Sequence, residues 1–217
     1  MQPLLPLHIL KHKLIQAYSI PAAPVEHCVE VKRSKFIARI AHAEDRISAM
    51  KSLEQAKQDY PDARHHCWAY LIGHPSQPSN AAFSDDGEPS GTAGKPILNV
   101  LNHSGIGDIL VVVIRYFGGI KLGAGGLVRA YSSSTQQAID LLETEQLIPT
   151  VELSFLSEYA LEPELRRFIE SQKGSILSAK YEMELFITAK IPIEAQTAVI
   201  EFVAGRRGLS LISDTAE

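Results

Sequence analysis

The spacing of apolar and polar residues predicts alternating strands and helices along most of the chain. Val, Ile and Phe are frequent over residues 21–42 and are interrupted by the polar run KRS at residues 32–34, which predicts a hairpin of two strands. A helix is predicted next, because Glu44 and Asp45 suit its first turn and Pro61 ends the pattern. The apolar face of this helix is predicted to consist of Ile47, Met50, Leu53 and Ala56.

Two strands and two helices are predicted in the middle of the chain. The branched run ILVVVIRYF, residues 109–117, is typical of a buried strand, and residues 97–102 predict a short helix. From Gly123 the period changes to a spacing of three and four that starts at Leu127, so a helix of about five turns begins in or just after GGIKLGAGG, residues 118–126. Residues 64–73 predict a strand in which His66, Trp68 and Tyr70 share one face and His65, Cys67 and Ala69 share the other.

The last third of the chain predicts the order strand, helix, strand, strand, helix, strand over residues 150–213. Pro163 suits the first position of the first helix, and Gly205 ends the second. The clearest strand signal is a strict period of two from Tyr181 to Ile191. This order is the split βαβ, ferredoxin-like plan.

These elements predict an α+β protein of two domains. A length of 217 residues with 45% apolar content fits a globular chain that has room for two ordinary domains. The segment LIPT, residues 147–150, predicts the linker. We expect residues 1–18 to form a poorly ordered extension, residues 19–143 the N-terminal domain and residues 149–214 the C-terminal ferredoxin-like domain.

The composition bears on the cellular compartment and the kinds of partner expected for the chain. The apolar run Pro3–Leu10 is too short to span a bilayer and no basic segment precedes it, so we expect no membrane association. Cys28 and Cys67 lack CxxC spacing, which fits a reducing compartment and predicts the cytoplasm. Residues 1–140 carry 14 Lys and Arg against 12 Asp and Glu, whereas residues 141–217 carry 7 against 13, so a polyanion would meet the first part more readily.

The glycine-rich segment after the 109–117 strand is the first candidate for chemistry. Glycine lets the backbone approach a ligand closely, and the start of the following helix offers free N–H groups and a positive dipole end, which favours phosphate. Two nucleotide-loop patterns fail, because Val128 stands where GxGxxG needs a glycine and Pro96 where a Walker A motif needs Ser or Thr. A tight turn with close helix packing is the alternative. The candidates are Arg115, Gly118, Gly119, Lys121, Gly123, Gly125, Gly126 and Arg129.

The loop SDDGEPSGTAGKP, before the predicted short helix, is the second candidate. Its carboxylates, Asp85, Asp86 and Glu88, can bind Mg²⁺ or serve as acid and base, because hard cations prefer clustered oxygen ligands. The alternative, which we favour, is a structural turn whose oxygens accept from nearby N–H groups while Ser90 or Thr92 caps the next helix. We expect no cofactor, with Mg²⁺ as the one candidate ion. The loop, residues 84–96, also contributes Gly87, Gly91 and Lys95.

The segment His65, His66 and Cys67 suggests metal ligands, but its strand geometry opposes this reading. Neighbours on a strand face opposite ways and cannot grip one ion together, so we favour half-buried sheet residues. Trp68 and Tyr70 could stack on bases, yet aromatic residues at alternate strand positions usually belong to a core. The sequence contains no GxSxG motif that would mark a nucleophilic serine.

Three long segments together resemble the IMPACT family. They are ARHHCWAY at residues 63–70, FSDDGEPSGTAGKPIL at residues 83–98 and VVVIRYFGGIKLGAGGLVRAY at residues 111–131, and the resemblance covers residues 19–213. It implies an N-terminal β-α-β sandwich with the fold of the second domain of the fifth small-subunit ribosomal protein, a fold shared by elongation factor G domain four and by sugar kinases. It also implies a ferredoxin-like C-terminal domain similar to elongation factor G domain five.

The resemblance further implies a role connected with translation. Eukaryotic members are similar to regulators of the kinase that phosphorylates an initiation factor, and these act by binding protein. For bacterial members the family implies RNA or ribosome association, with no established reaction and no catalytic residues to transfer. The kinases that share the fold hold phosphate on a glycine-rich loop before a helix, and GGIKLGAGG occupies the comparable place.

We therefore expect residues 84–96 and 118–126 to meet in one cleft that binds a phosphate-bearing ligand, with RNA or the ribosome as partner. An enzyme acting on a phosphorylated small molecule or nucleotide is one alternative, although no catalytic residue is identified. A protein-binding adaptor is the other, and the oligomeric state stays open. The side chains expected to contact phosphate are Lys95, Arg115, Lys121 and Arg129.

Overall fold

The computed structural model describes residues 17–212, which divide into two compact units, residues 18–147 and residues 148–212. Both units combine helices with antiparallel sheets, so the α+β class is confirmed. The expectation for residues 1–18 falls almost entirely outside the described residues. At its last position it is wrong, because Tyr18 is buried and begins the first strand. Over residues 17–212, no helix has the length and apolar character needed to cross a membrane.

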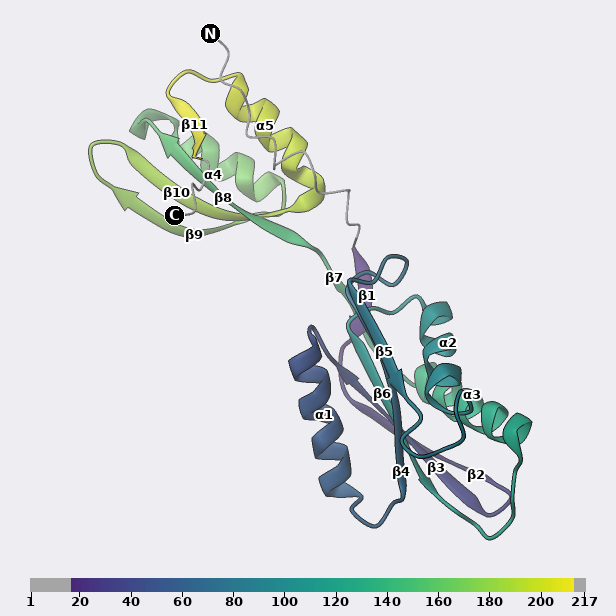
Figure 1. Ribbon diagram of the computed structural model, residues 1–217. Helices are drawn as coiled ribbons and strands as arrows, with labels where there is room; N and C mark the ends of the chain where they lie inside the picture. Colours follow the sequence, from purple (N-terminus) through teal and green to yellow (C-terminus); the bar gives the residue numbers. More distant parts are fainter. Residues whose placement is uncertain (1–16, 213–217) are drawn as a thin grey trace. The chain divides into compact units, whose positions relative to one another are not determined.

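A five-stranded antiparallel sheet in the order β2-β3-β6-β4-β5 lies at the centre of the N-terminal unit. One helix, α1, covers one face, and two helices, α2 and α3, lie side by side over the other (Figure 1). The middle strand is buried almost throughout because both faces are covered. The elements are β1 Tyr18–Pro21, β2 Val25–Val31, β3 Ser34–His42, α1 Arg46–Asp59, β4 His65–Ile72, β5 Asn80–Ser84, α2 Gly94–Ser104, β6 Ile109–Tyr116, α3 Ala124–Asp140 and β7 Thr144–Leu147.

The predicted hairpin and the predicted faces of β4 are confirmed. Strands β2 and β3 pair through a turn at Lys32 and Arg33, both of which have positive φ, 48° and 64°. On β4, Tyr70 packs in the core beneath α1, whereas Cys67 and Ala69 pack in the core beneath α2 and α3. The alternation along this strand therefore directs successive side chains into two separate cores.

The predicted apolar face of α1 is wrong at Ile47, which is exposed. The helix begins at the N-cap Asp45, whose carboxylate accepts from the Ser48 N–H at 2.7 Å. The side chains that pack against the sheet set the rotation of the helix, and Ile47 lies two residues before the first of them, on the far side. The buried residues of the helix are Ala49, Leu53 and Ala56.

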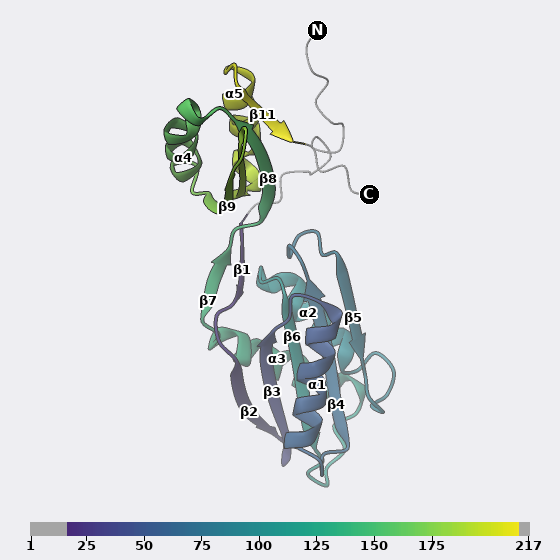
Figure 2. The ribbon, with the colours of Figure 1, turned by 90° about the vertical axis from the view of Figure 1, so that its left-hand side faces the viewer.

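Three strands were not predicted from the sequence. Strand β5 lies at the edge of the sheet and is mostly exposed, so it lacks an alternating apolar pattern. Strands β1 and β7 form a separate antiparallel ribbon (Figure 2). In this ribbon Tyr18 pairs with Leu147. The predicted linker at residues 147–150 is consequently shorter, since Leu147 ends β7 and Thr150 begins the next strand.

The C-terminal unit is a four-stranded antiparallel sheet in the order β11-β8-β10-β9 with two helices, α4 and α5. Leu165 of α4, Val199 of α5 and Ile187 of β10 share one core on one face of this sheet. The predicted order of strands and helices is confirmed. The elements are β8 Thr150–Ser157, α4 Glu162–Ser171, β9 Ser175–Tyr181, β10 Leu185–Pro192, α5 Gln196–Ala204 and β11 Leu209–Ile212, with short 3₁₀ turns at Tyr159–Leu161 and Ile193–Ala195.

The single strand predicted from Tyr181 to Ile191 is wrong, because two strands and a turn share this pattern. Tyr181 ends β9 and Leu185 begins β10, and the N–H of Glu182 donates to the carbonyl of Glu184 across the turn. Met183 lies at the tip and is 99% exposed. An apolar residue in the turn therefore continued the period of two without belonging to a strand.

The alternation of buried and exposed side chains along β10 can be tested by mutation. We predict that Ile187→Ala lowers the free energy of unfolding by about 2–5 kcal/mol, because this side chain is 1% exposed in the core. Phe186→Ala is the matched control, since Phe186 points to the opposite face and is 37% exposed. Denaturant unfolding with hydrogen exchange resolves the C-terminal unit. Equal losses for both variants would contradict the assigned faces.

Candidate functional site

Asp85 organises the loop of residues 84–96, which we call the acidic loop and which joins β5 to α2. Its carboxylate accepts hydrogen bonds from the N–H groups of Gly91, Ala93 and Gly94 at 2.8, 2.9 and 2.9 Å. Burial alone would raise the pKa of Asp85, but the three donors together hold it below its ordinary value. This side chain therefore closes the loop and caps the start of α2.

The expectation that Ser90 or Thr92 caps α2 is wrong. The Thr92 hydroxyl donates to the carbonyl of Pro89 at 2.7 Å, and Ser90 is exposed on the loop. The N-cap residue, Ala93, has no side chain that can accept. A carboxylate has more acceptor positions than a hydroxyl, so Asp85 satisfies several backbone donors of the loop at once.

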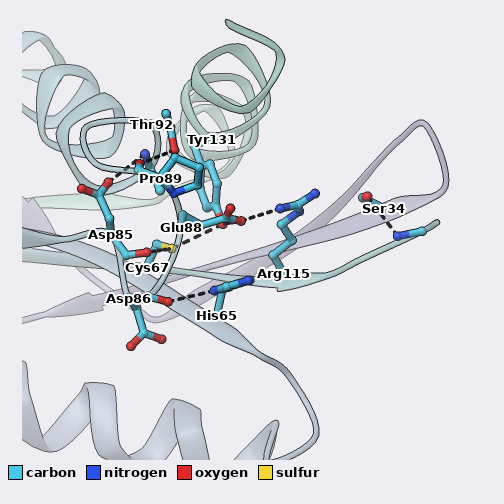
Figure 3. A network of polar contacts seen from close by, with 12 residues as sticks. Ser34, His65, Cys67, Asp85, Asp86, Glu88, Pro89, Thr92, Arg115 and Tyr131 are labelled. Atoms are coloured by element: carbon cyan, nitrogen blue, oxygen red, sulfur yellow. Dashed lines mark hydrogen bonds and ion pairs between the residues drawn. The ribbon is translucent and has the colours of Figure 1, made fainter. Parts of the chain in front are cut away.

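Asp86 ties the acidic loop to the start of β4, as Figure 3 shows. Its carbonyl oxygen lies 2.8 Å from Nδ1 of His65. Its carboxylate accepts from the N–H of His66 at 2.6 Å. The thiol of Cys67 donates to the carbonyl of Asp85 at 2.9 Å. Each of the first three residues of β4 thus holds part of the loop.

Glu88 and Arg115 form a buried ion pair with 2.6 Å between Oε1 and Nη1. Their side chains are only 4% and 8% exposed, and the Tyr131 hydroxyl donates to the same Glu88 oxygen at 2.9 Å. Cys67 Sγ lies 3.3 Å from that hydroxyl. Burial raises the pKa of the Cys67 thiol to about 12, so this group stays protonated at neutral pH. The cluster joins the acidic loop, β4, β6 and α3.

The three carboxylates of the acidic loop do not converge on a metal position. Asp85 faces the backbone of its own loop, Asp86 faces β4, and Glu88 faces Arg115. Within residues 17–212, no group of three His, Cys, Asp or Glu side chains is placed to hold a metal ion. Asp85 and Asp86 therefore fit the favoured alternative, in which the loop is a structural turn. Glu88 instead orients the basic side chain of Arg115.

The glycine-rich turn between β6 and α3 contains both structural and accessible glycines. The N–H of Gly118 donates to the Ser34 hydroxyl at 3.1 Å, and a Cβ at Gly118 would overlap the backbone of Arg33. Gly118 therefore serves close packing against the β2–β3 turn. Gly123, the N-cap of α3, has φ of 72°, a left-handed conformation that favours glycine, and space for a Cβ around it.

The first turn of α3 carries backbone N–H groups that no side chain of the N-cap residue binds. Gly123 has no side chain, so it cannot cap the helix. The N–H groups of Ala124, Gly125 and Gly126 occupy the first helical positions, where the helix itself supplies no acceptor. The positive end of the helix dipole adds to these donors, so this turn favours a negatively charged group.

The acidic loop and the glycine-rich turn line a common cavity of about 360 Å³. We call this cavity the cleft. Of the candidates from the sequence, Glu88, Arg115, Lys121 and Gly123 line it, whereas Lys95 and Arg129 do not. The remaining loop and turn candidates lie outside the lining as well. The full lining consists of Arg64, His65, Glu88, Pro89, Arg115, Phe117, Lys121, Leu122, Gly123, Ala124 and Leu127.

Sequence reasoning missed Arg64 as a member of the cleft. Arg64 directly precedes β4, where His65 pairs with Arg115 in the register of β4 and β6. That pairing joins residues far apart in the chain, and residue spacing does not reveal it. A signal was present, because Arg64 lies within the ARHHCWAY segment that carries the family resemblance.

Comparison with known proteins decides the family. The Impact N-terminal domain model matches residues 32–139, which contain both the acidic loop and the glycine-rich turn. The protein named IMPACT family member YigZ, from Escherichia coli (strain K12), is 40% identical over 178 residues, covering 82% of this chain and 87% of the relative. This chain belongs to the IMPACT family. A Haemophilus influenzae protein named IMPACT family member is 38% identical over 199 residues, 90% of this chain and 97% of the relative.

A solved structure and a eukaryotic relative extend the comparison. A crystal structure described as that of an hypothetical protein has a TM-score of 0.71 and 37% identity, and it covers 94% of this chain and 100% of that one. The Protein IMPACT homolog of Dictyostelium discoideum is 31% identical over 131 residues, 59% of this chain and 37% of the relative. The IMPACT family is thus represented in both bacteria and a eukaryote.

The role of Asp85 leads to a stability test with a definite pH dependence. We predict that Asp85→Ala lowers the free energy of unfolding at neutral pH by about 1–3 kcal/mol, because the N–H groups of the loop lose their acceptor. Asp62→Ala, at an exposed turn before β4, is the control. Because the folded state lowers the pKa of Asp85, this contribution is full above the unfolded pKa of about 4 and is lost as the pH falls below it.

Denaturant unfolding of both variants and the parent protein from neutral pH to acid measures this difference. The gap between the parent protein and Asp85→Ala should narrow as the pH falls through the titration of Asp85. A gap that stays constant, or that widens toward acid, would show that the carboxylate charge does not stabilise the loop.

Proposed function

We propose that this IMPACT-family protein binds RNA, free or within the ribosome, through the cleft and thereby takes part in the regulation of translation. The observation that carries the proposal is the charge around the cavity. Arg64, Arg115 and Lys121 line it, and Glu88 is the one carboxylate among the lining residues. Since Glu88 is paired with Arg115, the remaining charge at the cleft is positive.

The backbone supports a phosphate ligand in the same place. Gly123 and Ala124 bring the start of α3 to the cavity wall, where N–H donors and the helix dipole favour an anion. Arg64 and Lys121 are exposed and can add charge-assisted hydrogen bonds to phosphate oxygens. These donors act on the phosphate group and read no base sequence, as in most contacts to a nucleic-acid backbone.

The architecture supports a place near translation by likeness of fold. We infer that the N-terminal unit has the fold implied by the family resemblance, that of a ribosomal protein domain and elongation factor G domain four. The strand order β11-β8-β10-β9 supports a ferredoxin-like C-terminal unit comparable with elongation factor G domain five. A role at the ribosome would place the protein in the cytoplasm. The free thiols of Cys28 and Cys67 fit such a reducing compartment.

An enzyme acting on a phosphorylated small molecule or nucleotide is the second candidate, because a cavity of about 360 Å³ has the size of a ligand pocket. The groups around it offer little for catalysis. Glu88 is engaged by Arg115 and Tyr131, and the raised pKa of Cys67 keeps its thiol unreactive. Nucleotide-induced melting shifts that persist at high salt would favour this candidate, since groove-bound RNA is more sensitive to salt.

A protein-binding adaptor would need a contiguous apolar patch on the C-terminal sheet. On the outer face of that sheet Phe186 lies opposite Leu156 and Ile212 lies opposite Ser154, but the other pairs in the adjacent rows are polar. They pair Ser154 with Thr188 and Glu152 with Lys190. This mixed face supports an adaptor less well than the cationic cleft supports RNA.

The cleft cations lead to a direct binding test. We predict that the double variant Arg64→Gln and Lys121→Gln binds single-stranded RNA more weakly, with a salt slope reduced by about 1.4, since each lost phosphate contact removes about 0.7. Both side chains are exposed, so the fold should be retained. Fluorescence anisotropy over a series of KCl concentrations measures the slope.

The matched control is Arg46→Gln with Lys51→Gln, which removes the same charges from α1 on the other face of the sheet. This variant should keep the slope of the parent protein. An unchanged slope in the cleft variant would exclude the proposed contacts. Equal losses in both variants would show that binding depends on net charge and not on the cleft.

A further inference from the structure

Phe117 is a large aromatic side chain that the fold leaves open beside the cleft. It follows the last residue of β6, is 57% exposed and lines the cavity. The guanidinium carbon of Arg115 lies 5.7 Å from the centroid of its ring, which fixes one side of the ring against a buried charge. Its placement fits a stacking platform, because bases of unpaired nucleic acid stack on accessible aromatic rings.

Arg115 presents a second feature that the chain itself does not explain. Nη1 is engaged by Glu88, but Nε is buried and has no hydrogen-bond partner among the described residues. The side chain is 8% exposed and lines the cleft. An unpaired buried donor is costly, and Arg115 lines the cleft, which points to an acceptor that a ligand supplies to this side chain.

The size and walls of the cleft restrict what that ligand can be. About 360 Å³ lies near the lower end of the range of about 300–1,000 Å³ that holds a single ligand. The walls come from the start of β4, the acidic loop, the end of β6, the glycine-rich turn and the first turns of α3. A cavity of this size takes one nucleotide unit, whereas a duplex presents its phosphates on a convex surface.

We propose, on the basis of the function proposed above, that the cleft binds the phosphorylated end of an unpaired RNA strand. The terminal phosphate lies at the first turn of α3 between Arg64 and Lys121, and the terminal base stacks on Phe117. The guanidinium of Arg115 donates to an oxygen of the same nucleotide. A terminal phosphate has one covalent link to the strand and a charge of about −1.5 to −2, so it suits a small, cationic cavity better than an internal phosphodiester does.

The test measures binding of the full chain to three RNAs of one unstructured sequence. One carries a 5′-phosphate, one carries a 3′-phosphate, and one has hydroxyl groups at both ends. We expect one phosphorylated RNA to bind about tenfold more tightly than the hydroxyl RNA, as one added charge-assisted hydrogen bond would give. The two phosphorylated RNAs distinguish which end is recognised.

Three results would overturn the proposal. Equal affinity for all three RNAs would remove end recognition and leave the RNA-binding function standing. Absence of binding to every RNA would overturn the proposed function together with this inference. Uridine monophosphate competing as strongly as the phosphorylated RNA would assign the cleft to a small phosphorylated molecule.

A pair of variants tests the stacking platform separately. Phe117→Ala should weaken binding of the phosphorylated RNA at least about fivefold, because base stacking on an aromatic ring is lost. Ile120→Ala is the control, since Ile120 is exposed in the same turn but does not line the cavity. Both side chains are exposed, and circular dichroism checks the fold of each variant. Equal affinities for the two variants would overturn the role of Phe117.

Discussion

The buried ion pair between Glu88 and Arg115 is the interaction on which the cleft depends. It joins the acidic loop to the end of β6, and Tyr131 extends the contact to α3. Removing one member of a buried pair costs about 3–5 kcal/mol, because the other charge stays buried and uncompensated. The pair therefore holds two distant segments together and also sets the charge balance between them.

The acidic loop builds a cationic site because its carboxylates are used internally. The carboxylate of Asp85 accepts from three backbone N–H groups of the loop, and that of Asp86 accepts from the N–H of His66 in β4. Neither carboxylate therefore faces the cleft. Glu88 neutralises only part of the local positive charge, since Arg64 and Lys121 also line the cavity. A segment that is acidic by composition thus supports the binding of an anion.

The sequence predicted most of this architecture where a local pattern and a tertiary environment agree. Strand β6 could be predicted because a run of branched residues is typical of a strand buried on both faces. The rotation of α1 could not, because the spacing of Ile47, Met50, Leu53 and Ala56 also fits one face, and packing against the sheet buries Ala49, Leu53 and Ala56 instead. The turn at Met183 was missed for a related reason, since an exposed apolar residue continued the period of two.

The sequence allowed us to predict that two segments meet at the site, but not which residues line it. The sequence indicated a shared cleft because two loops that allow unusual backbone geometry carry opposite charges. Both loops line the cavity. Lys95 and Arg129 were included for their charge and their closeness in sequence, yet they lie outside its lining. Arg64 and Phe117 enter only through the register of β4 with β6 and the course of the chain after β6, which local spacing does not encode.

The most direct test of anion binding at the cleft is a titration of the full chain with inorganic phosphate, followed through the backbone amide resonances. Binding at the cleft predicts saturable shifts for Ala124, Gly125 and Gly126 in the first turn of α3, with the amide of Lys51 on α1 unchanged. Resonances of the α3 turn that stay fixed while phosphate shifts other parts of the molecule would contradict the cleft as an anion site.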